Sequence, residues 1–239
     1  MKIDFHCHML LSQKTPFDKW LFEKTIAQAK KMGLDALVLT EHMPAQYFEQ
    51  MFEYLQENFL YNGLCYNVDG FRLYTGMEVD IEGRGHILVM GERNDVLVLR
   101  RKFLAYENEP KLEELINEAR EYDTFIVGAH PYREGRELVG MDIESLKKLD
   151  ALDVNGKDWF LKSDTELFAK FLGLPVVAGS DTHIYLQAGV IHSEFDKPFD
   201  TIAELKAIVS ETSPPIWLDS KIGEKVQYAA EAKALLKKM

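Results

Sequence analysis

The feature that most constrains the fold of this chain is an alternation of short apolar runs with stretches of helical periodicity, from end to end. Runs such as ALVLTEH, TFIVGAHP and VVAGSDTH are rich in β-branched residues and short enough to be buried strands. Strands that alternate with helices favour a mostly parallel sheet with helices packed outside it. The sequence therefore predicts an α/β protein.

Local signals indicate where some helices begin and end. Thr15 and Pro16 are placed to begin a first helix, which Gly33 would end. Ser163 and Glu166 have the spacing of a capping box at the start of a later helix. The sequence contains no linker-like tract and no repeat of fixed period. Because barrels of alternating strand and helix often have about 200 to 250 residues, we expect residues 1–239 to form one domain.

Composition narrows the class of protein. The 239 residues are 46% hydrophobic and 28% charged, which is typical of globular proteins. No apolar run approaches the ~20 residues of a membrane-spanning helix, so we expect no membrane partner. The N-terminus lacks the basic and apolar regions of a signal peptide, which favours a cytoplasmic protein. Two cysteines are too few for a disulfide framework.

The net charge of −11 bears on the class of partner. Binding to the phosphate backbone of a nucleic acid relies on Lys and Arg, so we do not expect a nucleic acid as a partner. A small phosphorylated substrate is compatible with this charge, because bound cations can dominate the local field.

The stretch DFHCH near the start of the chain carries the first chemical signal. In a strand, His6 and His8 would point to the same side with Cα atoms roughly 6.6 Å apart, so that both imidazoles could approach one ion. By itself, this spacing is equally compatible with two polar residues at the end of a strand.

Polar side chains recur where the predicted strands end. In a closed barrel the carboxyl ends of the strands share one face, so ligands that are distant in the sequence meet there. Imidazole and carboxylate groups are ligands of Zn, Mn and Fe(II). The sequence therefore predicts a metal site at this face, formed from among His6, His8, Glu41, His42, Glu78, His130, Asp181 and His183.

Six motifs follow one another along the chain: DFHCH, EH at 41–42, GMEVD around Glu78, GHILVMG from Gly85, GAHP around His130 and GSDTH around Asp181. Together they resemble the PHP superfamily, named for polymerase and histidinol phosphatase. This resemblance implies a single distorted TIM-like barrel, (β/α)7, with its metal site at the C-terminal ends of the strands. It also implies two or three divalent metal ions as cofactors, which could be Zn, Mn or Fe.

The resemblance, carried over residue by residue, implies three ion positions. The first would be held by His6, His8, Glu78 and Asp181. The second would be held by Glu78, His86 and His130, with Glu78 bridging the two ions. The third would be held by His42 and His183. The assignment of His86 rests on the family pattern, because this residue begins an apolar run instead of ending one.

The third position departs from the family pattern. Many members have another His or an acidic residue shortly after the HxH motif, whereas this chain reads MLLSQKTPFD. Asp18 is the one nearby carboxylate, and we expect it to belong to a helix. His42 and His183 can therefore be interpreted as ligands of a weakly held third ion, as groups that transfer protons, or as structural residues.

Paired divalent cations suit the hydrolysis of phosphoesters, because they acidify a water and neutralise oxygens that gain negative charge. Asp181, His42 and His183 are the expected catalytic residues. The candidates for substrate binding are Arg84, Arg133, Arg136 and Lys157, since cationic side chains, and Arg in particular, match phosphate oxygens. The alternative for each of them is an exposed loop position.

The favoured hypothesis is a metal-dependent phosphatase or phosphodiesterase that acts on a small phosphorylated metabolite or nucleotide, with histidinol phosphate among the candidates. A nuclease that trims nucleic-acid ends and an amidohydrolase that cleaves C–N bonds are the alternatives within the hydrolases. A barrel that holds metal only for structure is a further alternative, although a structural Zn site normally needs just four ligands. The physiological substrate and the oligomeric state stay open.

Overall fold

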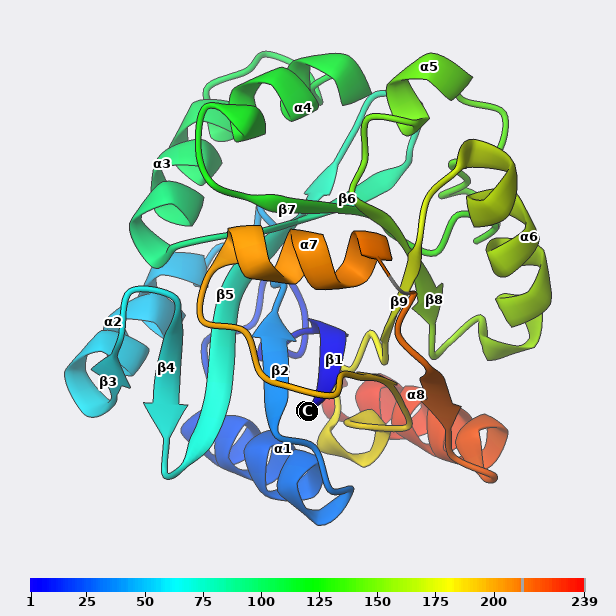
Figure 1. The fold of residues 1–239 in the computed structure, drawn as a ribbon. Coiled ribbons are helices and arrows are strands. Elements are labelled where there is room, and N and C mark those ends of the chain that lie inside the picture. The colour runs from blue at the N-terminus through cyan, green and yellow to red at the C-terminus, as the bar shows by residue number, and fades with distance from the viewer. Residues whose placement is uncertain (212, 239) are drawn as a thin grey trace.

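A computed structural model of the protein describes residues 1–211 and 213–238, with strands at the centre and helices around them (Figure 1). The strands of the described residues are β1 Lys2–Cys7, β2 Ala36–Leu39, β3 Leu60–Tyr61, β4 Cys65–Val68, β5 Phe71–Asp80, β6 His86–Met90, β7 Phe125–Gly128, β8 Ala151–Asn155, β9 Val176–Gly179, β10 Ile191–Glu194 and β11 Ile216–Leu218. The helices are α1 Lys19–Lys31, α2 Phe48–Asn58, α3 Arg93–Leu104, α4 Leu112–Arg120, α5 Ile143–Leu146, α6 Lys162–Leu172, α7 Ile202–Glu211 and α8 Ile222–Leu236, with short 3-10 turns η1 Trp159–Leu161 and η2 Tyr185–Gln187.

Seven of the strands form a barrel in the order β1-β2-β5-β6-β7-β8-β9. The barrel closes between its first and last strands through a bridge between Cys7 and Thr182, where the His8 amide donates to the Thr182 carbonyl at 2.8 Å. Close contact requires glycine here, because a Cβ at Gly179 would lie only 2.2 Å from the Cβ of His6. The predicted distorted barrel is therefore confirmed.

One strand of the barrel runs against the others. β6 pairs antiparallel with both β5 and β7, whereas the pairs β1–β2, β2–β5, β7–β8 and β8–β9 are parallel. A tight hairpin at residues 81–85 takes the place of a crossover helix between β5 and β6. The beginning of β6 consequently lies at the same end of the barrel as the carboxyl ends of the parallel strands.

Further strands extend the sheet beyond the barrel. β4 pairs antiparallel with β5 and carries β3, while β10 pairs antiparallel with β1 and carries β11. The pairing of Lys2 with Glu194 shows that residues after the last predicted motif return to the first strand. The alternation of apolar runs and helical periods did not predict these additions.

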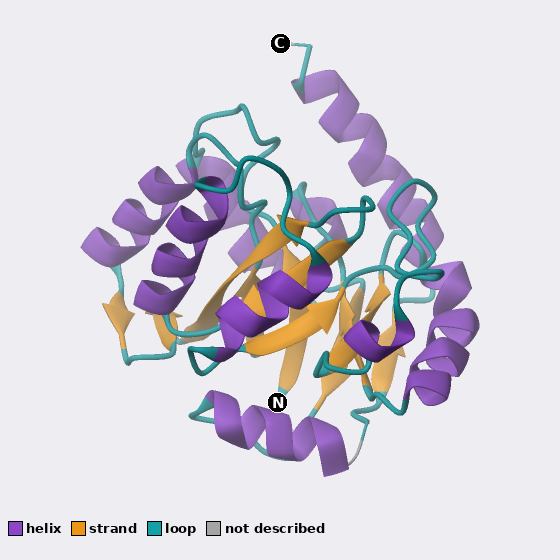
Figure 2. Ribbon diagram, turned by 90° about the horizontal axis from the view of Figure 1, so that it is seen from above, coloured by secondary structure: helices purple, strands orange, loops and turns teal. Residues whose placement is uncertain are grey.

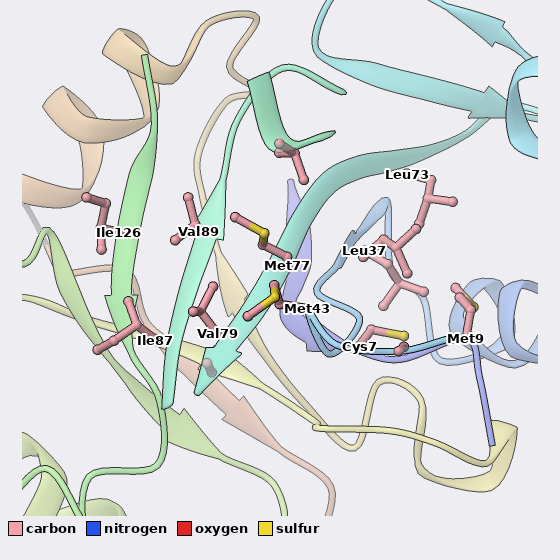
Figure 3. Close-up of a cluster of buried hydrophobic side chains, with 14 of the residues drawn as sticks. Cys7, Met9, Leu37, Met43, Leu73, Met77, Val79, Ile87, Val89 and Ile126 are labelled. Atoms are coloured by element: carbon pink, nitrogen blue, oxygen red, sulfur yellow. The ribbon is translucent and has the colours of Figure 1, made fainter. Parts of the chain in front are cut away.

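Apolar side chains that point outward from the barrel pack under the helices, which surround the strands (Figure 2). Figure 3 shows part of this layer, formed by every second residue of neighbouring strands. Its labelled members include Leu37 of β2, Leu73 and Val79 of β5, Ile87 of β6 and Ile126 of β7.

The inward-facing side chains divide the barrel interior into two parts. At the amino ends of the parallel strands they are apolar, and we call this part the apolar half; it contains Ile3, Phe5, Val38, Tyr74, Leu88, Phe125, Val127 and Val177. Helix α7 crosses this end of the barrel (Figure 1) and closes it with Ile202, Leu205 and Val209. At the opposite end the inward positions are polar, and we call this part the polar half.

Helix ends agree with some sequence signals and correct others. α1 begins at Lys19 and not at Thr15 or Pro16, because the Asp18 carboxylate accepts the first free amides of the helix. α6 begins at Lys162 without a side-chain cap, so the expected capping box of Ser163 and Glu166 does not form. The predicted stop at Gly33 is confirmed, since this residue has φ of 79° just after α1, and Gly173 ends α6 in the same way with φ of 75°.

None of the described helices is long and apolar enough to cross a membrane.

Candidate metal centre

The first strand turns both of its histidines into the polar half. The pairing of β1 with β2 changes register between Asp4 and Cys7, so Phe5 faces the apolar half while His6 and His8 face the polar half. Such an irregularity lets a strand re-aim a side chain. The two imidazole rings lie 5.2 Å apart, centroid to centroid, as the alternation predicts.

The other strands supply inward polar groups at the same level. Glu78 and Asp80 come from the end of β5, and His86 comes from the start of the reversed β6. His130 and Asp181 follow β7 and β9 with φ of 32° and 55°, in the region that non-glycine residues rarely adopt. Strained backbone of this kind is found mainly where a site requires it.

Glu78 lies at the centre of the polar half and is almost fully buried, with 2% of its surface exposed. Its Oε1 lies 2.7 Å from His86 Nδ1 and 3.2 Å from His130 Nε2. Its Oε2 lies 2.9 Å from His42 Nδ1 and 3.4 Å from His8 Nε2. One carboxylate therefore contacts imidazoles on both of its oxygens, which is the arrangement that a bridging ligand needs.

Three groups of side chains place their ligand atoms close enough to hold a metal ion, within 4.8 Å of one another. They are His6, His8 and Asp181; Glu78, His86 and His130; and His8, His42 and His183. The first two groups match the ion positions implied by the resemblance, with Glu78 next to the first group at 3.4 Å from His6 Nε2. The reversed direction of β6 explains why His86 joins them.

The Nε2 atoms of two histidines have the features of metal ligands. The Nε2 atoms of His6 and His8 are buried and accept or donate no hydrogen bond within the described residues, although both face carboxylates. Buried polar atoms are nearly always paired, so unpaired ones require an explanation. A divalent cation fits, because imidazole and carboxylate groups are its preferred ligands.

Buried carboxylates orient the rings of His6 and His8 through contacts with their Nδ1 atoms. His6 Nδ1 lies 3.0 Å from Asp153 Oδ2, and His8 Nδ1 lies 3.3 Å from Glu41 Oε1. A carboxylate on Nδ1 fixes the proton there and leaves Nε2 as the ligand atom. Glu41 also accepts the amides of Met9 and Leu10, which ties the segment after DFHCH to this half of the barrel.

The third group differs from the other two. The rings of His42 and His183 lie 4.4 Å and 4.1 Å from that of His8, but His8 Nε2 also faces the first group. A nitrogen with one lone pair binds one ion, so His8 cannot serve both positions at once. Asp18, the first carboxylate after the HxH motif, caps α1 and does not reach the site.

The charges in the polar half shift several pKa values. Burial opposes ionisation of Glu78 and Asp181, but neighbouring cationic groups outweigh it and hold both pKa values well below the ordinary range. Burial also opposes protonation of His6, yet Asp181 and Glu78 raise its pKa to about 10. For His130, burial dominates and lowers the pKa to about 4. The site therefore holds ionised carboxylates, as metal binding requires.

Arg133 lies beside the metal ligands and is held firmly by the protein. It donates to Asp181 Oδ2 at 2.7 Å, to Asn155 Oδ1 at 2.8 Å and twice to Asp158 Oδ2. These bonds use four of its five N–H donors, so one is left for a substrate oxygen. A bidentate clamp on phosphate, as expected from the sequence, would need some of these bonds to open.

Two lysines lie at the edge of the site. Lys157 Nζ lies 2.6 Å from Asp181 Oδ1 and 3.5 Å from His183 Nδ1. Lys233 reaches the same region from α8 and lines a pocket of about 230 Å³ together with Lys157 and His183. Burial and the charge of Lys157 lower the pKa of Lys233 to about 7.

The remaining two candidates for substrate binding are more distant. Arg136 lies 3.7 Å from Asp80 Oδ1, and Asp80 in turn lies 2.9 Å from His86 Nε2. Arg84 is exposed in the hairpin after β5, with φ of 71°, and its side chain forms no hydrogen bond or ion pair with a described residue, although its charge acts on Glu137. Arg133 and Lys157 therefore contact the candidate ligand Asp181 directly. Arg136 approaches His86 only through Asp80, and Arg84 lies outside the site.

Sequence reasoning missed Asp153 and Lys233 as site residues. Asp153 had a signal, because it and Asn155 alternate within the buried strand ALDVN and must share one face. Lys233 had none, since only the packing of α8 against η2 brings it to the site.

Comparison with known proteins bears on the family and on the fold. The model of the PHP domain matches residues 4–212 of the chain. No curated protein sequence matches. Among solved structures, PsfC from Pseudomonas syringae PB-5123 is similar with a TM-score of 0.84 and 22% identity, over 98% of each chain.

Two further structures share the fold at lower identity. A two-domain protein from Bacteroides vulgatus, described as containing a predicted PHP-like metal-dependent phosphoesterase, has a TM-score of 0.63 and 14% identity, over 95% of this chain and 69% of that one. A lesion-specific endonuclease from Pyrococcus furiosus has a TM-score of 0.68 and 19% identity, over 90% of this chain and 57% of that one. This chain therefore spans just over half the length of the endonuclease.

The endonuclease corrects one expectation. A related structure of endonuclease Q holds a duplex substrate with an abasic lesion at the active site. The expectation, drawn from the net charge of −11, that a nucleic acid is an unlikely partner was therefore wrong. Net charge averages over the whole surface, whereas Arg133, Lys157 and Lys233 show that the field at the site itself is set locally.

With its motifs, its barrel and the match over residues 4–212, the chain belongs to the PHP family.

Proposed function

We propose that this protein is a metal-dependent phosphoesterase, a phosphatase or phosphodiesterase that hydrolyses a small phosphorylated metabolite or nucleotide. The observation that carries the proposal is the position of Glu78, whose two oxygens face the ligand nitrogens of neighbouring groups. Two divalent ions held there, Zn, Mn or Fe, would acidify a water and neutralise phosphoryl oxygens.

The chain's own residues have distinct roles in this proposal. His6, His8, Glu78 and Asp181 would hold the first ion, and Glu78, His86 and His130 would hold the second. Arg133 and Lys157 fix the Asp181 carboxylate, and the one free N–H of Arg133 contacts a substrate oxygen. Arg136, through Asp80 and His86, adds positive charge at the other side.

His42 and His183 act as acid and base in the proposal. The His42 side chain is 16% exposed, so it can exchange protons with solvent, and the buried His183 lines the small pocket beside α8. Occupation of this position by a third ion requires that His8 leave the first group, or that solvent complete the ligand set. We therefore favour proton transfer over a third ion of equal occupancy.

A panel of substrates tests the class of reaction. We expect p-nitrophenyl phosphate or its bis-ester to be hydrolysed in the presence of Mn or Zn, and an N-acyl amide to remain intact. Cleavage of the amide but not of either ester would support an amidohydrolase instead. Elemental analysis of the same samples should find more than one equivalent of transition metal.

An endonuclease function is the second candidate. It is favoured by the common fold with the Pyrococcus furiosus enzyme and by cationic side chains at the site despite the acidic chain. Single-stranded and abasic-site duplex DNA belong in the same panel. Cleavage of DNA at rates above those for the small esters would make the nuclease the better description.

A cytoplasmic location and a single domain over residues 1–239 stay predictions.

A further inference from the structure

A small pocket between η2 and α8 adjoins the metal centre. It has a volume of about 230 Å³. Its polar edge consists of Lys157, His183 and Lys233, and its walls include Ile184, Val226 and Ala229. Gln187 also lines it, but its side-chain amide is already bonded to the Ser180 and Asp181 carbonyls. The pocket is thus a largely apolar recess whose lining includes two lysine side chains.

The two lysines are not equivalent. Lys157 is paired with Asp181 Oδ1 at 2.6 Å. Lys233 forms no ion pair with any carboxylate among residues 1–211 and 213–238, and it is partly buried. Asp181 and Glu41 attract the charge of Lys233 without forming an ion pair with it, while burial and the charge of Lys157 oppose that charge. This placement is explained if an anion arrives with the substrate.

The substrate's phosphoryl group is not the best candidate for this anion. In the proposed function that group lies against Glu78 and Asp181, and neither of these residues lines the pocket. The recess instead suits the organic part of the substrate. A short apolar chain fits walls such as Val226 and Ala229, and a charged end would meet Lys233.

We propose that Lys233 selects phosphoesters whose alcohol part carries a second anionic group, a carboxylate or another phosphate, a few carbons from the scissile bond. This inference rests on the proposed phosphoesterase function and adds the class of substrate to it. Lys233 is a specificity residue, and Lys157 is shared between Asp181 and the incoming anion.

A matched series of substrates tests the proposal. n-Butyl phosphate and 3-carboxypropyl phosphate differ only in a methyl or carboxylate end, and propane-1,3-diol bisphosphate tests phosphate as the second anion. We expect kcat/KM to be at least about tenfold higher for the doubly anionic esters, which is the contribution of about one charge-assisted hydrogen bond. The larger of the two preferences identifies the anion.

Lys233→Met shortens the side chain by one atom and removes its charge. We expect the ratio of kcat/KM between the carboxylated and the plain ester to fall to within about twofold of one. Lys238→Met, on the exposed surface just beyond the end of α8, should keep the wild-type ratio. Equal efficiency for both esters in the wild type, or an equal loss on both in Lys233→Met, would overturn the proposal.

A binding measurement separates this inference from the proposed function. Calorimetry measures the binding affinities of 4-carboxybutylphosphonate and pentylphosphonate. Neither compound can be hydrolysed, so binding in the pocket is measured without turnover. Tighter binding of the carboxylated compound that disappears in Lys233→Met supports the pocket even if no ester is hydrolysed. Hydrolysis of the esters with no difference between the two phosphonates would keep the phosphoesterase and reject the role of Lys233.

Discussion

The two halves of the barrel interior are built from the same strands and are equally buried, but burial has opposite effects on the free energy of folding in the two halves. On β5, Tyr74 lies in the apolar half and Glu78, four residues later, lies in the polar half, with 0% and 2% of their surfaces exposed. Burial of Tyr74 stabilises the fold, since transfer of apolar surface from water is favourable. Burial of an ionised carboxylate costs free energy unless partners compensate it. The polar half therefore depends on its occupants in a way that the apolar half does not.

The largest expected effect comes from replacing the carboxylate at the centre of the polar half. Glu78→Gln should empty or weaken both neighbouring ion positions and reduce activity more than about 100-fold, because even loss of a residue that only orients a ligand costs 10- to 100-fold. Elemental analysis and kinetics measure both effects. Glu82→Gln, on the exposed hairpin of the same strand pair, should leave both unchanged.

A substitution in the apolar half should have the reverse outcome. Leu205 of α7 is fully buried in the closing layer, so Leu205→Ala should lower the free energy of unfolding by about 2–5 kcal/mol. Metal content per folded molecule should stay at the wild-type value. Ser210→Ala on the exposed side of α7 should change stability by less than about 0.5 kcal/mol. Loss of metal from folded Leu205→Ala would mean that the two halves are not independent.

A milder change within the polar half tests the orienting carboxylates. Asp153→Asn replaces the charged acceptor 3.0 Å from His6 Nδ1 with a neutral one. We expect the affinity for the first ion to fall by about 10- to 100-fold. Titration with a competing chelator measures this affinity, and the second ion, held by Glu78, His86 and His130, should be little affected. A uniform loss at both positions would argue for a structural role of Asp153.

A change of pH tests the polar half without any substitution. Without metal, the pKa of His6 is raised to about 10 and that of His86 to about 9, both against the effect of burial and through their carboxylate neighbours. Protons therefore occupy these rings at neutral pH, and an ion must displace them. Apparent metal affinity should rise as pH rises from 6 towards 9, by about tenfold per unit for each proton displaced. Calorimetry in buffers of different ionisation enthalpy counts those protons, and a count of zero would contradict the shifts.

The sequence predicted the polar half better than its surroundings. His6, His8, Glu78 and Asp181 were recognisable because each lies at the end of an apolar run, where strand alternation and barrel geometry determine its direction. His86 was not recognisable in this way, since the rule assumes parallel strands and β6 is reversed. Only the family pattern identified it.

Residues brought in by tertiary packing escaped prediction. The position of Lys233 depends on how α8 docks, and the four bonds of Arg133 depend on the loop that carries Asp158. The closing helix α7 and the strands β10 and β11 were likewise unpredicted, because single short elements after residue 183 carry weak periodic signals.

The reversed β6 also has a consequence for the order in which the centre assembles. Glu78 and His86 are separated by eight residues along the chain, whereas His6 and its partner Asp153 are separated by 147. Closing a short hairpin loses little chain entropy, so the hairpin can form while the ribosome is still synthesising the rest of the chain. The second ion position can then be completed by His130, soon after the middle of the chain. The first must wait for GSDTH, and so for nearly the whole barrel, which makes it the last part of the centre to become competent.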